Sequence, residues 1–247
     1  MSADTADFVT VDAFTRPAGG FRRWRTSVQA VLSAGVEGLR AATTNRTNDG
    51  THSLVPHVVP GGAALVAAWD SPEAAAAAWR GPLGRLLVGR DHFSLDGEVV
   101  RVRTQHPGDD WYGWSPSAAG AREIERDEPL VVIVHGVLRP RCLPGFLRNN
   151  LHAASRAAHH PGHRGSVDIS SDLPFEHTSV SLWSSAAQAL DYAYAPGGHA
   201  FAMKHAVSTD THRTGVFLRI RPLASAGGLG LPGPAYPDLR PTRRTDH

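Results

Sequence analysis

The feature that most constrains the fold of this chain is a strand-and-helix segment that occurs twice. A strand-like run at 63–69 ends in Trp69, and a second run at 178–183 ends in Trp183. Each tryptophan is followed by a serine-containing helix start and an alanine-rich helix, and 114 residues separate the two tryptophans. A repeat at this spacing predicts that the chain consists of two similar halves in tandem.

The remaining elements extend the repeat. Strands are expected where β-branched and aromatic residues cluster between turn residues, and helices where apolar residues recur every three to four positions. These rules predict strands at 8–14, 38–43, 63–69, 97–103, 130–138, 166–169, 178–183 and 215–221, and helices at 21–34, 70–79, 140–158 and 184–195. Each half then has the β-α-β-β-α-β order of a ferredoxin-like unit, with helices on one face of an antiparallel sheet.

The predicted fold class is α+β, with two tandem ferredoxin-like (βαββαβ) repeats whose sheets meet and form an α+β barrel. The first repeat is expected over 1–103, and the second repeat, which carries the candidate ligand described below, over 129–223. Residues 104–128 between them are a connector rich in Pro, Gly, Asp and Ser, anchored by two tryptophans. The segment 224–247 holds many Gly, Pro and charged residues and is predicted to be disordered.

Composition narrows the classes of protein to consider. The 247 residues are 41% hydrophobic and 19% charged, as is typical of a soluble globular protein. The net charge is only +2 and the basic residues are scattered, which argues against a nucleic-acid partner. The single cysteine, Cys142, excludes an internal disulfide and a cysteine-based metal cluster within a monomer, and it fits a reducing cytoplasm. The sequence shows no secretory signal, and no apolar run approaches the ~20 residues of a membrane span.

One histidine stands at a break in a helix of the second repeat. The helix that starts at 184 is interrupted at 196–198 by Pro-Gly-Gly, and His199 stands where the chain resumes, with Phe201 and Met203 close behind. An imidazole at such a break can reach a metal held in an apolar pocket. His199 is therefore the candidate axial ligand of a haem iron. The alternative is a surface histidine at the start of a helix.

Two further histidines are candidates for the same site. Alternation along a strand puts His177, Ser179, Ser181 and Trp183 on one face, which predicts a polar row that lines a cavity. His177 is the second candidate for the metal ligand, and the alternative is a strand-edge histidine bonded to backbone. His212 lies ahead of the last strand and suits a general acid or base, with a solvated loop histidine as the alternative.

Short motifs in both halves resemble the spheroidene monooxygenase family of bacterial carotenoid biosynthesis. The resemblance runs from about residue 8 to about residue 223 and is carried by the order and spacing of the motifs. In the second half these are L138-R-P-R141, F146-L-R148, H177-T-S-V-S-L-W183 and G197-G-H-A-F-A-M203. In the first half and the connector the motifs are Gly20-Phe21 with Trp24, Val55-Pro56, A67-A-W-D70 and the run W-Y-G-W-S-P from Trp111 to Pro116.

The resemblance implies a haem b enzyme with the dimeric α+β barrel fold, which chlorite dismutases, dye-decolourising peroxidases and aldoxime dehydratases share. The family inserts oxygen into a polyene. For this chain the resemblance implies His199 as the iron ligand, with Phe201 and Met203 beside the cofactor. It also implies that Arg139 and Arg141 bind haem propionates or polarise bound oxygen, and surface arginines beside a turn proline are the alternative.

The chain departs from that family where a substrate would bind. The family is rich in Trp, Glu and Tyr ahead of the last strand, whereas 209–218 here carries His212 and Arg213. The family's first helix is strongly aromatic, whereas here it begins F21-R-R-W-R25. A pocket for a long hydrocarbon should be apolar, so these changes predict a small polar metabolite rather than a carotenoid. His212, His177 and Arg141 are then the candidate catalytic groups.

Three functions remain open from the sequence. The first is a haem-dependent monooxygenase with a small-molecule substrate and an electron donor. The second is a haem enzyme without net oxygenation, such as aldoxime-dehydratase-like N–O cleavage or N–N bond formation. The third is a non-enzymatic haem- or ligand-binding module. Related barrels often self-associate, but a tandem repeat can close a barrel within one chain, so a homodimer is left open.

Overall fold

The computed structural model describes residues 7–48, 61–170, 175–195 and 199–227. The motif Val55-Pro56 and the predicted Pro-Gly-Gly break at 196–198 lie outside these residues. None of the helices that the structure describes is long and apolar enough to cross a membrane.

The two halves have matching orders of strands and helices. The first contains β1 (Phe8–Phe14), β2 (Arg16–Pro17), α1 (Phe21–Ser33), β3 (Leu39–Thr47), β4 (Ala63–Trp69), α2 (Pro72–Arg80), α3 (Pro82–Leu86), β5 (Gly89–Arg90) and β6 (Phe93–Thr104). The second contains β7 (Leu130–Leu138), the 3-10 helix η1 (Pro140–Cys142), α4 (Leu143–Ala158), β8 (His163–Ser170), β9 (Glu176–Trp183), α5 (Ala186–Tyr194), α6 (His199–Ser208) and β10 (His212–Ala226).

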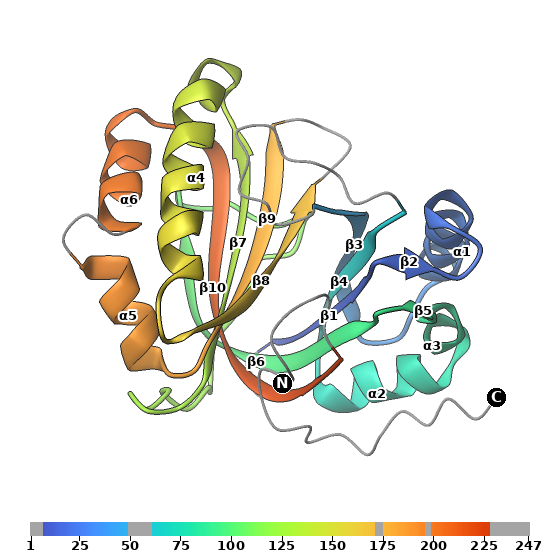
Figure 1. The fold of residues 1–247 in the computed structure, drawn as a ribbon. Coiled ribbons are helices and arrows are strands. Elements are labelled where there is room, and N and C mark those ends of the chain that lie inside the picture. The colour runs from blue at the N-terminus through green and yellow to red at the C-terminus, as the bar shows by residue number, and fades with distance from the viewer. Residues whose placement is uncertain (1–6, 49–60, 171–174, 196–198, 228–247) are drawn as a thin grey trace.

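The eight long strands form a closed antiparallel barrel in the order β1-β4-β3-β8-β9-β7-β10-β6. Two seams join the halves, β3 with β8 and β6 with β10. The helices lie outside the barrel, with α1–α3 over the strands of the first half and α4–α6 over those of the second (Figure 1). This arrangement confirms the predicted α+β barrel of two ferredoxin-like repeats.

Pairing between the halves makes several strands longer than the sequence pattern predicts. β3 continues to Thr47 because Arg46 and Thr47 pair with β8, and β6 begins at Phe93, with its residues from Ser94 on paired with β10 of the other half. β10 continues to Ala226, where its last residues pair with β6, so it includes the first residues of the predicted tail. Residues 228–247 of that tail lie outside the described residues.

The two repeated helices begin in the same way. The hydroxyl of Ser71 accepts a hydrogen bond from the amide of Ala74 at 3.2 Å, and that of Ser185 accepts one from Gln188 at 3.2 Å. A serine N-cap of this kind satisfies an amide that has no partner within its own helix. The two caps are separated by the same 114 residues as the two tryptophans, which supports the repeat.

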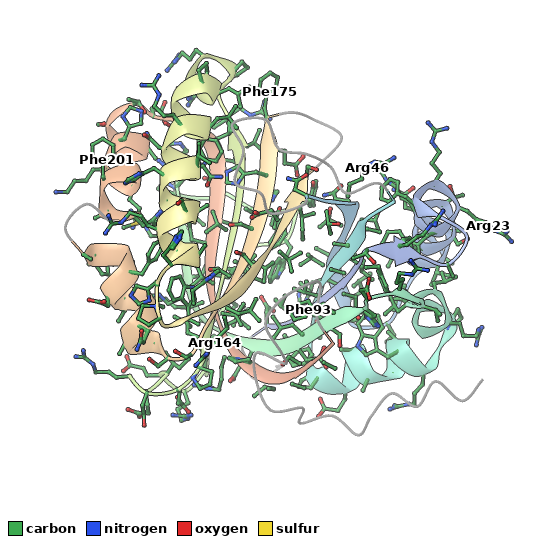
Figure 2. All side chains as sticks on the ribbon, in the orientation of Figure 1. Arg23, Arg46, Phe93, Arg164, Phe175 and Phe201 are labelled. Atoms are coloured by element: carbon green, nitrogen blue, oxygen red, sulfur yellow. The ribbon has the colours of Figure 1, made fainter. Side chains whose placement is uncertain are left out.

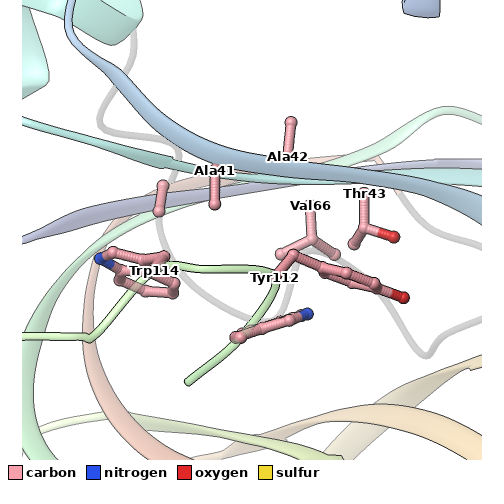
Figure 3. Close-up of a pocket in the computed structure, with 8 residues that line it drawn as sticks. Ala41, Ala42, Thr43, Val66, Tyr112 and Trp114 are labelled. Atoms are coloured by element: carbon pink, nitrogen blue, oxygen red, sulfur yellow. The ribbon is translucent and has the colours of Figure 1, made fainter.

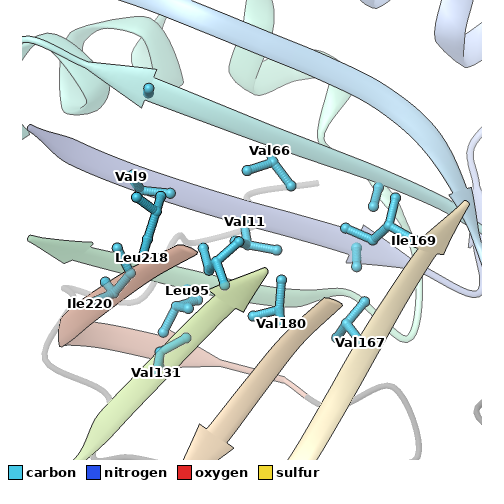
Figure 4. Packing of buried hydrophobic residues seen from close by; sticks show 14 of the residues in the cluster. Val9, Val11, Val66, Leu95, Val131, Val167, Ile169, Val180, Leu218 and Ile220 are labelled. Atoms are coloured by element: carbon cyan, nitrogen blue, oxygen red, sulfur yellow. The ribbon is translucent and has the colours of Figure 1, made fainter. Parts of the chain in front are cut away.

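Apolar side chains fill most of the barrel interior. Every second residue of each strand points inward, and those of β1, β4, β6, β7, β8, β9 and β10 belong to one buried cluster (Figure 4). An eight-stranded barrel is just wide enough for side chains to fill. The interior of the barrel therefore leaves no room for a large ligand.

The outer faces of the two halves differ at equivalent positions. In β4 the residues that face the helices are Ala63, Leu65, Ala67 and Trp69, and all are fully buried in a large apolar cluster with α1, α2 and α3. The equivalent residues of β9 are His177, Ser179, Ser181 and Trp183, and only the tryptophan is fully buried. The space between sheet and helices is thus an apolar core in the first half and partly polar in the second.

Truncation at one pair of equivalent positions should reveal this difference. Leu65→Ala removes a side chain with no exposed surface and should lower the free energy of unfolding by about 2–5 kcal/mol. Ser179→Ala, at the equivalent position, should cost less than about 1 kcal/mol because it leaves no large cavity. Urea denaturation followed by circular dichroism measures both, and equal losses would contradict the inferred difference in packing.

Candidate functional site

Two histidines meet on the helix-facing side of the second half. His177 of β9 and His212 at the start of β10 approach across β7, and their Nε2 atoms are 3.2 Å apart. Gly136 of β7 lies between them in the sheet, where it pairs with His177. A Cβ atom at Gly136 would stand 2.6 Å from the His212 ring and 3.2 Å from Nε2 of His177. The glycine therefore leaves the room that the two rings occupy.

The histidine pair is covered and kept uncharged. Phe146 of α4 packs against both rings, with centroid distances of 4.6 Å to His177 and 5.8 Å to His212. Burial, and then the charges of His212 and His135, lowers the pKa of His177 to about 3. Burial also lowers the pKa of His212. Both rings are neutral near pH 7, so one Nε2–H can donate to the other Nε2.

The Nδ1 atom of His212 is buried and makes no hydrogen bond with any described residue. Whichever tautomer the ring adopts, this nitrogen is left as a free donor or a free acceptor. Leaving such a group unpaired costs stability, and a bound ligand or water could recover that cost. The pair therefore has the character of a ligand-facing site more than of a closed structural contact.

An ion pair holds the start of β10 in place. The guanidinium of Arg139 lies 2.9 Å from the carboxylate of Asp210 and also donates to the Asp210 carbonyl oxygen at 3.1 Å. The amide of Arg139 donates to the carbonyl of Thr211, the residue before His212. Arg139 thus positions His212, and its role as a haem-propionate ligand stays a prediction.

His199 begins α6 and stacks on an aromatic column. Its ring lies 5.8 Å from the ring of Tyr192 at an angle of 18°, and Tyr192 stacks in turn on Trp183 at 4.9 Å. Tyr192 also donates to the carbonyl of Ala153 in α4 at 2.8 Å. Burial holds the pKa of His199 below its ordinary value, and its Nδ1 is buried without a partner among the described residues. A neutral imidazole with an unpaired nitrogen is the form that binds a metal ion.

The other residues predicted to bind the cofactor do not form one cluster with His199. Phe201 points away from the barrel on the outside of α6 and is 61% exposed (Figure 2). Met203 is half-buried on the same helix. Within the described part of the chain, no ring contact joins His199 to the pair of His177 and His212. Arg141 is exposed on η1 and lines a pocket with Arg139 and Arg213.

A polar cluster at one end of the barrel interior was not predicted. His135 stacks on Trp111 at 4.7 Å and shares a 2.9 Å hydrogen bond with Thr178. Tyr112 donates to the carboxylate of Glu176, and burial, then that carboxylate, raises the pKa of Tyr112 to about 12. Burial lowers the pKa of His135 to about 4. The available signal was the alternation in β7, which puts His135 on the same side as the inward-facing Ile133.

The predicted anchoring role of the two connector tryptophans is confirmed. Trp111 and Trp114 are 3% and 5% exposed, and the Trp114 indole donates to the carboxylate of Asp7 at 2.9 Å. Together with Tyr112 they face β3 and β4 across a small apolar pocket (Figure 3). The connector thus closes one part of the barrel interior.

Comparisons with known proteins support the fold. No protein-family model matches the chain, and no curated protein matches it. The crystal structure of an aldoxime dehydratase matches with a TM-score of 0.52 and 11% identity, over 89% of this chain and 83% of that one. A putative monooxygenase from Fusobacterium nucleatum matches with a TM-score of 0.39 and 10% identity, over 93% and 98% of the two chains. A haem-degrading enzyme from Listeria monocytogenes matches with a TM-score of 0.29 and 10% identity, over 85% and 98%.

At these identities the likeness to the aldoxime dehydratase establishes the fold alone. This chain shares the dimeric α+β barrel fold, in which two ferredoxin-like units enclose one barrel. The more specific resemblance to spheroidene monooxygenases stays a prediction.

Substitution of the glycine between the two histidines should separate them. In Gly136→Ala the new methyl group would overlap the His212 ring, so the Nε2–Nε2 hydrogen bond should be lost. We expect a loss of about 1–3 kcal/mol from overpacking and shifted ring 15N signals for both histidines by NMR. Gly145→Ala is the control, because its Cβ would meet His205 at an ordinary 3.4 Å. Unchanged histidine signals in Gly136→Ala would contradict the geometry.

Acidification should destabilise the protein through its buried neutral histidines. Their folded pKa values are below the unfolded value of 6.5, so the unfolded state binds more protons below that pH. Above pH 6.5 these histidines do not lower the free energy of unfolding. Below it the free energy of unfolding falls, until the pH reaches about 4 for His135 and about 3 for His177.

His135 alone should account for about 2 kcal/mol of the stability lost between roughly pH 7.5 and pH 5. His135→Gln should therefore show a correspondingly smaller loss in urea unfolding measured at these two pH values. His152→Gln, on an exposed position of α4, should keep the pH dependence of the natural protein. An identical pH dependence in both variants would rule out His135 as a source.

Proposed function

We propose that this protein is a haem b enzyme, and that it is a monooxygenase acting on a small polar metabolite. The observation that carries the proposal is the replacement of an apolar core by neutral histidines, half-buried at 177 and buried at 212, on the outer face of the second half. The first half has Ala63 where the second has His177, and Leu65 where the second has Ser179. Polar groups in such a place cost stability, so a function is the natural reason for them.

The residues present fit a haem. His199 offers an unpaired buried nitrogen on a neutral ring, which suits an axial iron ligand, and His177 is the second candidate. The aromatic column of Trp183 and Tyr192 orients His199. Of the two residues predicted to lie beside the haem, Phe201 does not fit this role, since its side chain is exposed. When bound, the haem would supply the binding and activation of oxygen, and a separate reductant would supply electrons.

The side chains of the pair have a defined task in this proposal. His177 and His212 hold one proton between their Nε2 atoms and can pass it to or from a ligand. Gly136 allows their contact, Phe146 packs against it, and Arg139 positions His212 through Asp210. Both rings are neutral near pH 7, and the pair would accept a proton at the unpaired Nδ1 of His212 rather than at His177, whose pKa of about 3 makes it a weak base.

The same pair favours one alternative within the haem enzymes. Cleavage of an N–O bond without net oxygenation requires proton delivery to the leaving oxygen, and a ring of the pair would do this after first taking up a proton itself. The solved aldoxime dehydratase has the same fold, although the likeness of fold does not decide the reaction. A cytoplasmic location remains part of the proposal, and a homodimer stays open.

An absorption spectrum of the purified protein tests the cofactor. Protein produced with ample haem should show a Soret band that shifts on reduction. His199→Ala should lower the affinity for haem at least about tenfold, because it removes an axial ligand. His205→Ala is the matched control, a half-buried histidine on the same helix α6.

Absence of a Soret band would leave a non-enzymatic ligand-binding module as the better explanation. Equal spectra for His199→Ala and His205→Ala would instead move the ligand role to another residue, and His177→Ala tests the second candidate. Oxygen consumption with a reductant then separates the monooxygenase from the N–O cleaving alternative.

A further inference from the structure

A pocket of about 530 Å³ opens at the end of the barrel where β7 ends and β9 and β10 begin. Its size lies within the range of small-molecule sites. Phe175 lies at this end of the barrel, near the start of α4 (Figure 2). The pocket is lined by Val137, Leu138, Arg139, Pro140, Arg141, Phe175 and Arg213.

Two of the three arginines are available to a ligand. Arg139 is engaged by Asp210 through its side chain, as described above. Arg141 and Arg213 are exposed, and neither forms an ion pair or a side-chain hydrogen bond with a residue that the structure describes. Guanidinium groups bind carboxylates through paired N–H donors.

The helix that follows the pocket adds to its positive character. α4 has 16 residues, its first turn contains no acidic residue, and no side chain caps its first amides. The positive end of its dipole is therefore not neutralised by the helix itself. Among the described residues next to the lining, the carboxylate of Asp210 is paired with Arg139, and that of Glu176 accepts a hydrogen bond from Tyr112.

The floor of the pocket is apolar. Val137, Leu138, Pro140 and Phe175 contribute hydrocarbon surface beside the arginines. Inorganic phosphate would use the charge but not this floor, whereas an organic anion with a hydrocarbon or aromatic body uses both. The lining therefore matches an amphipathic carboxylate.

The pocket borders the histidine pair. Leu138 pairs with His212 across the β7–β10 ladder, Arg213 follows His212 directly, and Phe175 precedes His177 by two positions. The pocket thus adjoins the backbone near both histidines, although neither ring is part of its lining.

We propose that this pocket binds the carboxylate of an organic anion, held by Arg141 and Arg213, with the apolar part of the anion on Phe175 and its neighbours. The inference rests on the proposed function in one respect, namely that this anion is the substrate. The carboxylate could also belong to a haem propionate, and the experiment separates these two sources.

The first measurement is a calorimetric titration of the purified full chain with phenylacetate and with its neutral isostere phenylacetamide. Phenylacetate should bind at least about tenfold more tightly than the amide, because charge-assisted hydrogen bonds to arginine depend on the negative charge. Arg141→Ala and Arg213→Ala should each weaken phenylacetate at least about tenfold. Arg148→Ala, an exposed arginine of α4 outside the pocket lining, should have no effect.

The second measurement compares haem with haem dimethyl ester, which lacks free carboxylates. If Arg141→Ala and Arg213→Ala weaken haem but not its ester, and leave phenylacetate unaffected, the pocket holds the cofactor and the substrate assignment is overturned. Equal binding of phenylacetate and phenylacetamide, or no binding of either, overturns the pocket proposal altogether. If phenylacetate binds as expected but haem does not bind, the pocket stands and the proposed haem function fails.

Discussion

Backbone hydrogen bonds between the two halves hold this structure together. Each half on its own would be a four-stranded sheet with two unpaired edges, which invite association with other chains. The β3–β8 and β6–β10 seams pair those edges within one chain and close the barrel. The seam between β6 and β10 is the longer of the two, and it extends both strands beyond what their sequences alone suggest.

Closure determines where a ligand can bind. Because the interior of the barrel is filled by apolar side chains, most of the chemistry-bearing residues lie elsewhere. The outer face of the first half is sealed by an apolar core around Leu65 and Trp69. The outer face of the second half keeps the tryptophan at the same position, but it replaces the preceding residues by serine and histidine. The first half is thus closed by an apolar core, and the second carries the polar residues on which the proposed function rests.

The polar residues of the second half depend on one another. His177 and His212 are tolerated without charge because they pair with each other, because Gly136 makes room for them and because Phe146 covers them. Arg139 joins the β7 end to the turn before β10, and it thereby links the histidine pair to the arginine-lined pocket. The histidine pair and the pocket are therefore neighbours in the fold, as the roles proposed for them require.

The sequence by itself determined the repeat and most of its strands and helices. Trp69 with Trp183 and Ser71 with Ser185 mark equivalent points, because local packing and capping leave the same residue types at the same spacing. The sequence also indicated that His177 and the two serines share one face of β9, since side chains alternate along any strand. Only the tertiary structure decided that His177 meets His212, that Tyr112 meets Glu176 near His135, and that Arg139 is engaged by Asp210. These contacts join segments far apart in the chain, which no local pattern encodes. The meeting of His177 with His212 follows from the strand order β9-β7-β10 and from the irregular pairing at His212.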